Sequence, residues 1–181
     1  MAILAVALLA WPASADDRAA GSGEPAHCAA ILQPSGSSAA VAAPAVRCFG
    51  TIAESVAYAT DGAIRLSPGQ RYPTAAQAAA AGRNSAASVL LGIEYGNRDF
   101  TGSTLSLSGT SGTGCYNGVS YGFASLPSGW NDEISSSKAY SNCHGWHYEH
   151  TYSGAVLICQ PNCRSFSSAM NDETSSIVFK R

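Results

Sequence analysis

Charge is scarce in this sequence, which already excludes one large class of functions. Only 12% of the 181 residues are charged, and the formal net charge is -2. The ten lysines and arginines are scattered along the chain, so no basic surface is available to neutralise phosphate groups. Nucleic-acid binding is therefore not expected.

Two familiar ligand-binding patterns are also missing. A glycine-rich stretch runs from Ser108 to Gly114, but no lysine follows it and no helical pattern opens after it, so it does not predict a phosphate-binding loop. The cysteines include no Cys-x-x-Cys pair, which argues against a zinc site. We interpret the glycine-rich stretch as a hairpin loop.

The chain begins with an apolar run that is too short to span a membrane. Residues 1–15 are apolar and end in Ala13-Ser14-Ala15, the small-x-small form of a signal-peptidase site. No positive charge precedes the run, although signal peptides usually carry one. A membrane helix needs about 20 apolar residues. We therefore predict a cleaved signal peptide and a secreted protein.

The six cysteines predict disulfide bonds. An even number of cysteines in an exported chain favours disulfides, because the compartment is oxidising. Six cysteines allow 15 pairings, and proximity in the sequence favours three of them: Cys28 with Cys48, Cys115 with Cys143, and Cys159 with Cys163.

Residues 16–87 form a segment rich in alanine, glycine and serine, with short helices near its end. Its first part shows little periodicity and predicts a flexible lead-in. Thr51-Ile-Ala-Glu54 is a capping box that predicts a helix from Ile52 to Thr60. A similar Thr74-x-x-Gln77 pattern opens an alanine run that Gly82 should end. We expect this second helix to face solvent.

The strongest signal is an internal repeat within residues 88–181, where strand-like alternation begins. Ser125–Ser136 matches Ser165–Ser176 at an offset of 40 (171 minus 131), and both contain Asn-Asp-Glu-x-Ser-Ser. Tyr95–Gly102 matches His147–Gly154 at an offset of 52 (152 minus 100). The difference places an insertion in the first copy, in the loop that ends at Gly118.

Each copy therefore contains an aromatic hairpin, a strand, a loop and a final strand. The final strands are expected at Ser137–Tyr140 and Ile177–Lys180. Two units of this kind are sufficient for an all-β sandwich of two Greek-key motifs. We assign residues 88–181 to this domain.

These features resemble the βγ-crystallin family, in which hairpins end in an aromatic-x-Gly pattern and calcium-binding members carry [ND]-[ND]-x-x-[ST]-Ser loops. Within it, the chain is similar to small exported bacterial proteins grouped with the Streptomyces metalloproteinase inhibitor and the killer-toxin-like protein. The fold is not a usual home for catalysis. The resemblance therefore implies a protein that is not an enzyme.

The resemblance also implies two calcium clefts at one end of the domain. One would take Glu133 and Ser135 with the hairpin near His150, and the other Glu173 and Ser175 with the hairpin near Arg98. The full set of implied positions is Asn131, Asp132, Glu133, Ser135, Asn171, Asp172, Glu173, Ser175, Arg98 and His150.

Two readings of these loops remain open. Asn, Asp and Ser side chains satisfy backbone amides in tight loops without any metal. Calcium prefers six to eight oxygen ligands, usually including carboxylates, whereas Arg98 and His150 bring cations to the hairpins. We expect weak calcium binding, or loops that have kept only their shape.

The histidines His144, His147 and His150 are spaced along one predicted strand. Successive strand residues face opposite sides, so His147 should point away from the other two and a transition-metal site is not expected. The tryptophans and tyrosines of the repeats are expected in the core.

Two functions follow from the repeat and its resemblance. The first is a structural or protective role outside the cell, for a monomer with weak calcium sites. The second is inhibition of an extracellular protease through an exposed rigid loop, for which Gly109–Gly118 and Gln160–Cys163 are the candidates.

Overall fold

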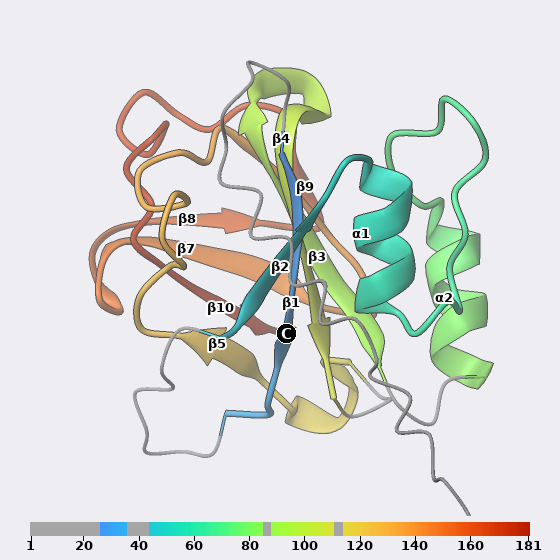
Figure 1. Ribbon diagram of the computed structural model, residues 1–181. Helices are drawn as coiled ribbons and strands as arrows, with labels where there is room; N and C mark the ends of the chain where they lie inside the picture. Colours follow the sequence, from blue (N-terminus) through green and yellow to red (C-terminus); the bar gives the residue numbers. More distant parts are fainter. Residues whose placement is uncertain (1–25, 36–43, 85–87, 111–113) are drawn as a thin grey trace, which may run out of the picture.

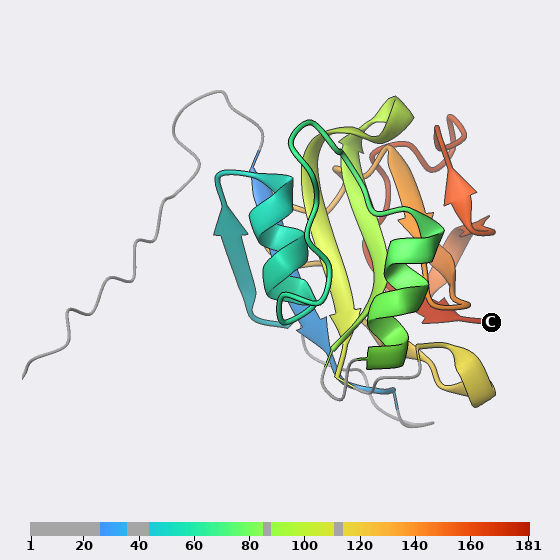
Figure 2. The same ribbon diagram turned by 90° about the vertical axis from the view of Figure 1, so that its right-hand side faces the viewer.

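The computed structural model describes residues 26–35, 44–84, 88–110 and 114–181, arranged in three layers (Figure 1). Two β-sheets, A and B, pack face to face. Helices α1 and α2 cover the other face of sheet A, so that sheet A is the middle layer (Figure 2). The predicted leader, residues 1–15, lies outside the described residues.

The expected pair of Greek-key motifs is present. The first repeat supplies β3 to β6 and the second supplies β7 to β10, with these bounds: β3 Val89–Asn97, β4 Thr101–Gly109, β5 Tyr121–Phe123, β6 Ser136–Ala139, β7 His144–His150, β8 Ser153–Cys159, β9 Asn162–Cys163 and β10 Ser176–Lys180. Sheet A contains β4-β3-β6-β9 and sheet B is β5-β10-β7-β8. Each repeat thus places its third strand in the other repeat's sheet, which interlocks the two motifs.

Sheet A contains two more strands than the repeat alone predicts. Strand β1 (His27–Leu32) pairs in parallel with β4, and β2 (Val46–Phe49) pairs antiparallel with β1. The flexible lead-in expected here is therefore wrong for the part that contains β1. The short apolar run from Cys28 to Leu32 gave no strand alternation, because alanine fills two of its positions.

Helix α1 (Ile52–Ala59) begins at the predicted capping box. The Thr51 amide donates to the Glu54 carboxylate at 3.0 Å, and the Glu54 amide donates to the Thr51 hydroxyl at 3.3 Å. These two bonds satisfy amides that the first helical turn leaves free. The predicted helix therefore differs from the observed one only at its last residue.

Helix α2 (Ala75–Asn84) corrects two expectations. It continues through Gly82 instead of ending there. It also does not simply face solvent, because Ala78 and Ala81 are buried in a second core with Leu90 and Ile93 of β3. Small alanine side chains allow the helix to approach the sheet closely, which compensates for the little area that each one buries.

All three predicted disulfides form: Cys28–Cys48, Cys115–Cys143 and Cys159–Cys163. The first links β1 to β2, and the third joins the end of β8 in sheet B to β9 in sheet A. Three disulfides indicate an oxidising environment. In the described part of the chain, no helix is long and apolar enough to cross a membrane.

Candidate functional site

The two copies of the Asn-Asp-Glu-x-Ser-Ser motif lie side by side and are hydrogen-bonded to each other. We call them the paired loops, Asn131–Ser136 and Asn171–Ser176. The Asp132 amide donates to the Thr174 carbonyl at 3.1 Å, and the Asp172 amide donates to the Ile134 carbonyl at 3.1 Å. Because the bonds are reciprocal, the duplicated sequence builds one two-loop unit.

The aspartates of the motif hold an uncommon backbone conformation. Asp132 and Asp172 both have φ of 58°, in the left-handed region. Asp and Asn adopt this region more readily than most residues, which explains why the motif requires one of them at its second position. The matching φ values confirm that the two loops have the same local structure.

The last serine of each motif fastens its loop to a hairpin. The Ser136 hydroxyl donates to the Asn97 carbonyl at 2.6 Å and accepts from the Phe100 amide at 3.1 Å. Ser176 repeats both bonds in the second hairpin, at 2.8 and 2.9 Å. The serine therefore has a structural role that is independent of any metal.

The first loop makes backbone contacts with the hairpin of its own repeat. The Ser135 amide donates to the Tyr95 carbonyl at 2.9 Å, and the Glu133 carbonyl oxygen lies 3.7 Å from the place of a Cβ on Gly96. The first loop thus lies against the hairpin of its own repeat. The second hairpin also reaches the first repeat, since the Thr151 hydroxyl donates to the Ala124 carbonyl at 3.1 Å, and a shared site with the hairpin near His150 stays a prediction.

The second loop also makes backbone contacts with the hairpin of its own repeat. The Ser175 amide donates to the Tyr148 carbonyl at 2.9 Å, within its own repeat, while the Arg98 hairpin reaches the second repeat through the Asp99 amide, which donates to the Arg164 carbonyl at 2.7 Å. The fifth-position serine of the first loop crosses between repeats, because the Ser135 hydroxyl donates to the Asp172 carboxylate at 2.8 Å. Two expected ligands, the Ser135 hydroxyl and the Asp172 carboxylate, thus meet between the repeats.

The hairpins themselves differ by one residue. Tyr95 pairs with Thr104 in the first hairpin, as Tyr148 pairs with Val156 in the second. Asn97 is therefore the counterpart of His150. Arg98 begins a short 3-10 turn, Arg98–Phe100, that makes the first hairpin tip longer. The sequence alignment had matched Arg98 to His150, and the extra residue at the tip is the reason for the difference.

The charges around the paired loops are unequal. At the first hairpin, Asp99 is bound by Arg164, with 2.6 Å between the guanidinium and the carboxylate. At the paired loops, the Glu133 and Glu173 side chains are exposed. In the second loop, Thr174 Oγ1 and Asn171 Oδ1 are both buried without a hydrogen-bond partner, and Asn171 Oδ1 can only accept. Buried acceptors of this kind usually have a partner, so this oxygen fits a cation or a donor.

The histidines do not form a metal centre. His147 is fully buried between the sheets, whereas His150 is exposed at the hairpin and His144 is half-buried at the start of β7. Among the described residues, no three His, Cys, Asp or Glu side chains are close enough together to hold a metal ion. Any calcium site here would depend on carbonyl, hydroxyl and amide oxygens in addition to single carboxylates.

Sequence reasoning missed a buried polar cluster between the sheets. His147 Nε2 lies 3.0 Å from Glu94 Oε2, with both side chains 0% exposed. The Ser137 hydroxyl donates to the other oxygen of Glu94 at 3.1 Å. Glu94 and His147 directly precede Tyr95 and Tyr148, so they hold equivalent positions in the two repeats. The only available signal was a charged residue in an otherwise apolar strand.

Comparisons with known proteins give similar solved structures but no family. No family model and no curated protein matches the chain. Among solved structures, the N-terminal domain of Protein S is 20% identical, with 49% of this chain and 93% of that chain covered and a TM-score of 0.37. A βγ-crystallin domain from Clostridium beijerinckii is 17% identical, with 50% and 97% covered and a TM-score of 0.37.

A third solved structure, a βγ-crystallin domain from Flavobacterium johnsoniae, is 22% identical, with 49% of this chain and 92% of that chain covered and a TM-score of 0.34. The fold is βγ-crystallin-like. The strand pairing is that of two interlocked Greek-key motifs, because each repeat gives its third strand to the opposite sheet, and this is the architecture that the repeat predicts. Identities and scores at this level carry no argument about function.

The sequence also contains one Gly-x-Ser-x-Gly stretch, Gly118–Gly122. Such a stretch marks a hydrolase nucleophile when it forms a turn from a strand into a helix. Here Ser120 directly precedes strand β5. The stretch therefore lacks the geometry of a nucleophile elbow.

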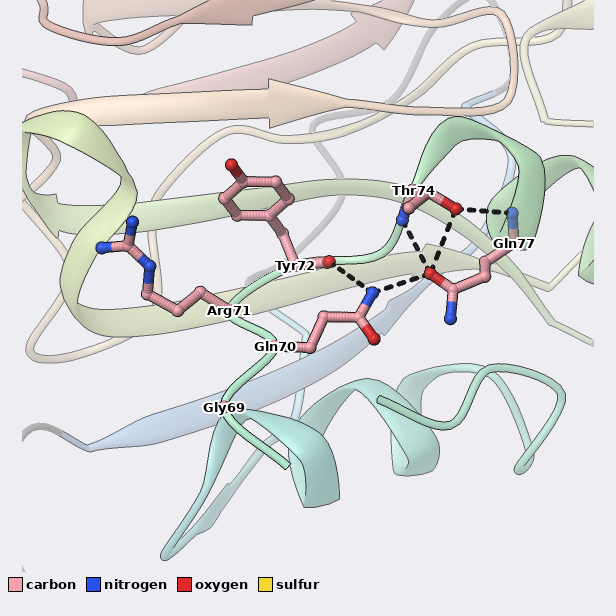
Figure 3. Close-up of a pocket in the computed structure, with 6 residues that line it drawn as sticks. All are labelled: Gly69, Gln70, Arg71, Tyr72, Thr74 and Gln77. Carbon is pink, nitrogen blue, oxygen red and sulfur yellow. Dashed lines mark hydrogen bonds between the residues drawn. The ribbon is translucent and has the colours of Figure 1, made fainter. Parts of the chain in front are cut away.

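Two surface hollows lie away from the paired loops. An open one of about 520 Å³ lies beside the start of α2 (Figure 3), and its polar groups largely bind each other. The Gln77 side-chain oxygen accepts from Gln70 Nε2 at 2.7 Å and from the Thr74 amide at 2.9 Å. The second, of about 750 Å³, lies between α2 and the β6–β7 turn. Neither includes a residue of the paired loops.

Proposed function

We propose that this is an exported structural or protective protein whose paired loops bind calcium weakly. The observation that carries the proposal is the reciprocal hydrogen bonding of the two loops, which gathers two exposed glutamates and the Asp172 carboxylate at one end of the sandwich. Calcium favours oxygen ligands of mixed type, including carbonyls and hydroxyls. Export is supported by the three disulfides together with the small-x-small site near the start of the chain.

The second loop is the better of the two candidates. It contains the Asn171 oxygen that has no partner, and the Asp172 carboxylate accepts from both Asn171 and Ser135. At the first hairpin, Arg164 already neutralises Asp99. We therefore propose unequal sites, with binding first at Asn171–Ser176. Competition from the internal hydrogen bonds keeps the affinity low.

Calorimetric titration of the disulfide-bonded protein with calcium tests this proposal. We expect heat from a site with Kd in the range of about 0.1–1 mM, as is usual for weak extracellular sites. Asp172→Asn should abolish the heat, since Asn keeps the left-handed backbone but removes the charge. Asp61→Asn is the matched control, because Asp61 also has positive φ but lies after α1. No heat in the wild type, or equal heat in D172N, would refute calcium binding.

Inhibition of an extracellular protease is a second candidate, favoured by one observation. The Gln160–Asn162 segment is exposed and is closed into a short loop by the Cys159–Cys163 disulfide. A loop that is already ordered loses little entropy when it enters a protease cleft. The other candidate loop, Gly109–Gly118, includes residues 111–113, which lie outside the described residues. Assays against metallo- and serine proteases at micromolar protein test this role, and no inhibition would remove it.

A further inference from the structure

The internal repeat allows the two sheets to be compared strand for strand, and one edge stands out. Strand β4 of the first repeat corresponds to β8 of the second. The outer edge of β4 is paired along its length with β1, from His27 opposite Thr104 to Leu32 opposite Gly109. In the described chain, β8 pairs only with β7. The same edge is therefore occupied in one repeat and open in the other.

The outward side chains of the covered strand β4 are polar, whereas those of the exposed strand β8 are apolar. The outward residues of β4 are Thr104 and Ser106, which are small and polar and are buried beneath β1 and α1. Their counterparts on β8 are Val156 and Ile158, and Val156 is 46% exposed. Leu157 between them packs on the core, so alternation directs its two neighbours outward. The strand that faces solvent is thus the more apolar one.

The other three sheet edges carry features that discourage further pairing. Edge strand β2 has the exposed cation Arg47. Strand β9 has two residues and β5 has three, and Pro34 bridges to β5 at Tyr121. Strand β8 has seven residues and contains neither proline nor charge. Proteins normally protect long apolar edges with charge, proline or a short strand, because an open edge accepts another strand.

We propose that β8 is a strand-addition surface whose occupant is a second copy of this chain, paired antiparallel through β8 about a twofold axis. Two copies of one strand are self-complementary in an antiparallel pair, which is the geometry of a twofold dimer. Charge agrees with this occupant, because no charged residue occurs from Thr151 to Cys163 and no like charges would meet. With Val156 at the twofold axis, the two copies of Val156 would cover each other, and Ile158 of each copy would lie opposite Gly154 of the other.

The size of the contact sets its strength. A seven-residue strand is about 24 Å long at about 3.4 Å per residue. The open amides are those of alternate residues: Thr104 donates to the Ala26 carbonyl on the β1 side of β4, so its counterpart Val156 faces the open edge, whereas the Ala155 amide faces β7 and donates to Glu149 at 2.9 Å. An edge contact of this length covers less than the roughly 800 Å² per partner of a standard interface. The dimer is therefore weak and depends on concentration, in contrast to the monomer expected from the sequence.

Sedimentation equilibrium of the full chain after leader removal tests the dimer, over about 10 µM to about 1 mM protein, the range in which a contact of this size dissociates. We expect the average mass to rise toward the dimer. Val156→Lys should raise Kd at least about tenfold, because two lysines would meet across the twofold axis. Ala45→Lys is the control, since it adds the same charge at an exposed position beside edge strand β2.

Three results would overturn the proposal: a wild type that stays monomeric at the highest concentration, a V156K protein that dimerises like the wild type, or an A45K protein that loses dimerisation to the same extent. Circular dichroism checks that each variant is folded. If V156K does not fold, V156T replaces it, because it copies the residue found at Thr104 and should also weaken the dimer.

Discussion

Strands β4 and β8 hold the same position in the two repeats. Their inner faces have similar surroundings, but their outer faces do not. On the inner side both place a leucine in the core, Leu105 and Leu157. On the outer side β4 is covered by β1 and α1, while most of β8 is exposed. The duplication thus preserves the backbone and the inner face. The outer face is set by what the rest of the chain adds to it.

The added N-terminal layer is also held by cation–π contacts. Lys138 of β6 places its ammonium 4.0 Å from the ring centroids of both Tyr72 and Phe100. Burial, and then the charge of Arg164, lower the pKa of Lys138. On sheet B, Lys180 of β10 lies over Trp146 of the neighbouring strand β7 at 3.9 Å. The same type of contact therefore joins two layers at sheet A, whereas at sheet B it joins two neighbouring strands of one sheet.

The largest expected effect comes from breaking the contact between the repeats. Glu94→Leu leaves His147 buried without its partner, which should cost about 3–5 kcal/mol of unfolding free energy. The double variant E94L/H147L should recover much of this loss, because both polar groups are then replaced by apolar ones. Urea unfolding measures all the variants. Additive losses would contradict a direct coupling between the two residues.

Equivalent core leucines should differ in their contribution. Leu105 is fully buried beneath a covered strand, whereas Leu157 is only partly buried. Leu105→Ala should cost about 2–5 kcal/mol, and Leu157→Ala should cost clearly less because solvent already reaches it. Thermal unfolding of both variants gives the comparison. Equal losses would mean that the outer cover of β4 adds nothing to its packing.

Removing disulfides should reveal how firmly the added strands are held. Cys28 and Cys48 are separated by 20 residues, and Cys159 and Cys163 by 4. Loop entropy predicts a loss of about 3 kcal/mol for C28A/C48A and about 2 kcal/mol for C159A/C163A. The melting temperatures of the two double variants check this order. The reverse order would indicate that β2 contributes little to sheet A.

The smallest expected effect is a pH dependence at the β1–β4 seam. His27 Nδ1 lies 2.9 Å from Thr104 Oγ1, and burial lowers the pKa of His27 below 6.5, opposed by the charge of Glu54. As pH falls through 6.5 the unfolded chain binds a proton first, so stability should decrease toward acid. Urea midpoints at about pH 8 and about pH 5 should differ less in His27→Asn than in the wild type.

Local patterns allowed much of the fold to be predicted from the sequence. The duplicated motif, the capping box at Thr51 and the three disulfides each depend on residues close together or repeated, and each is confirmed. Strand β1 was missed because its partner β4 lies far along the chain, and its alanines give no alternation. The burial of α2 was missed for a related reason, since the sequence does not state which surface a run of alanine meets.

Less of the candidate site than of the fold could be predicted from the sequence. The motif located both loops, but it did not show that each loop lies against its own hairpin. The extra residue at Arg98–Phe100 shifted the alignment by one position and hid the equivalence of Asn97 with His150. Glu94 and His147 were missed because their pairing depends on how two distant strands face each other in the sandwich.

Residue-resolved amide hydrogen exchange tests the contrast between the two strands most directly. In dilute, monomeric protein we expect continuous protection along β4, because β1 and β3 take its amides on both sides. Along β8 we expect protection to alternate, with amides facing β7 protected and those on the open edge exchanging quickly. Raising the concentration should protect the open-edge amides of β8. Uniform protection of β8 in the monomer, or rapid exchange along β4, would contradict the account.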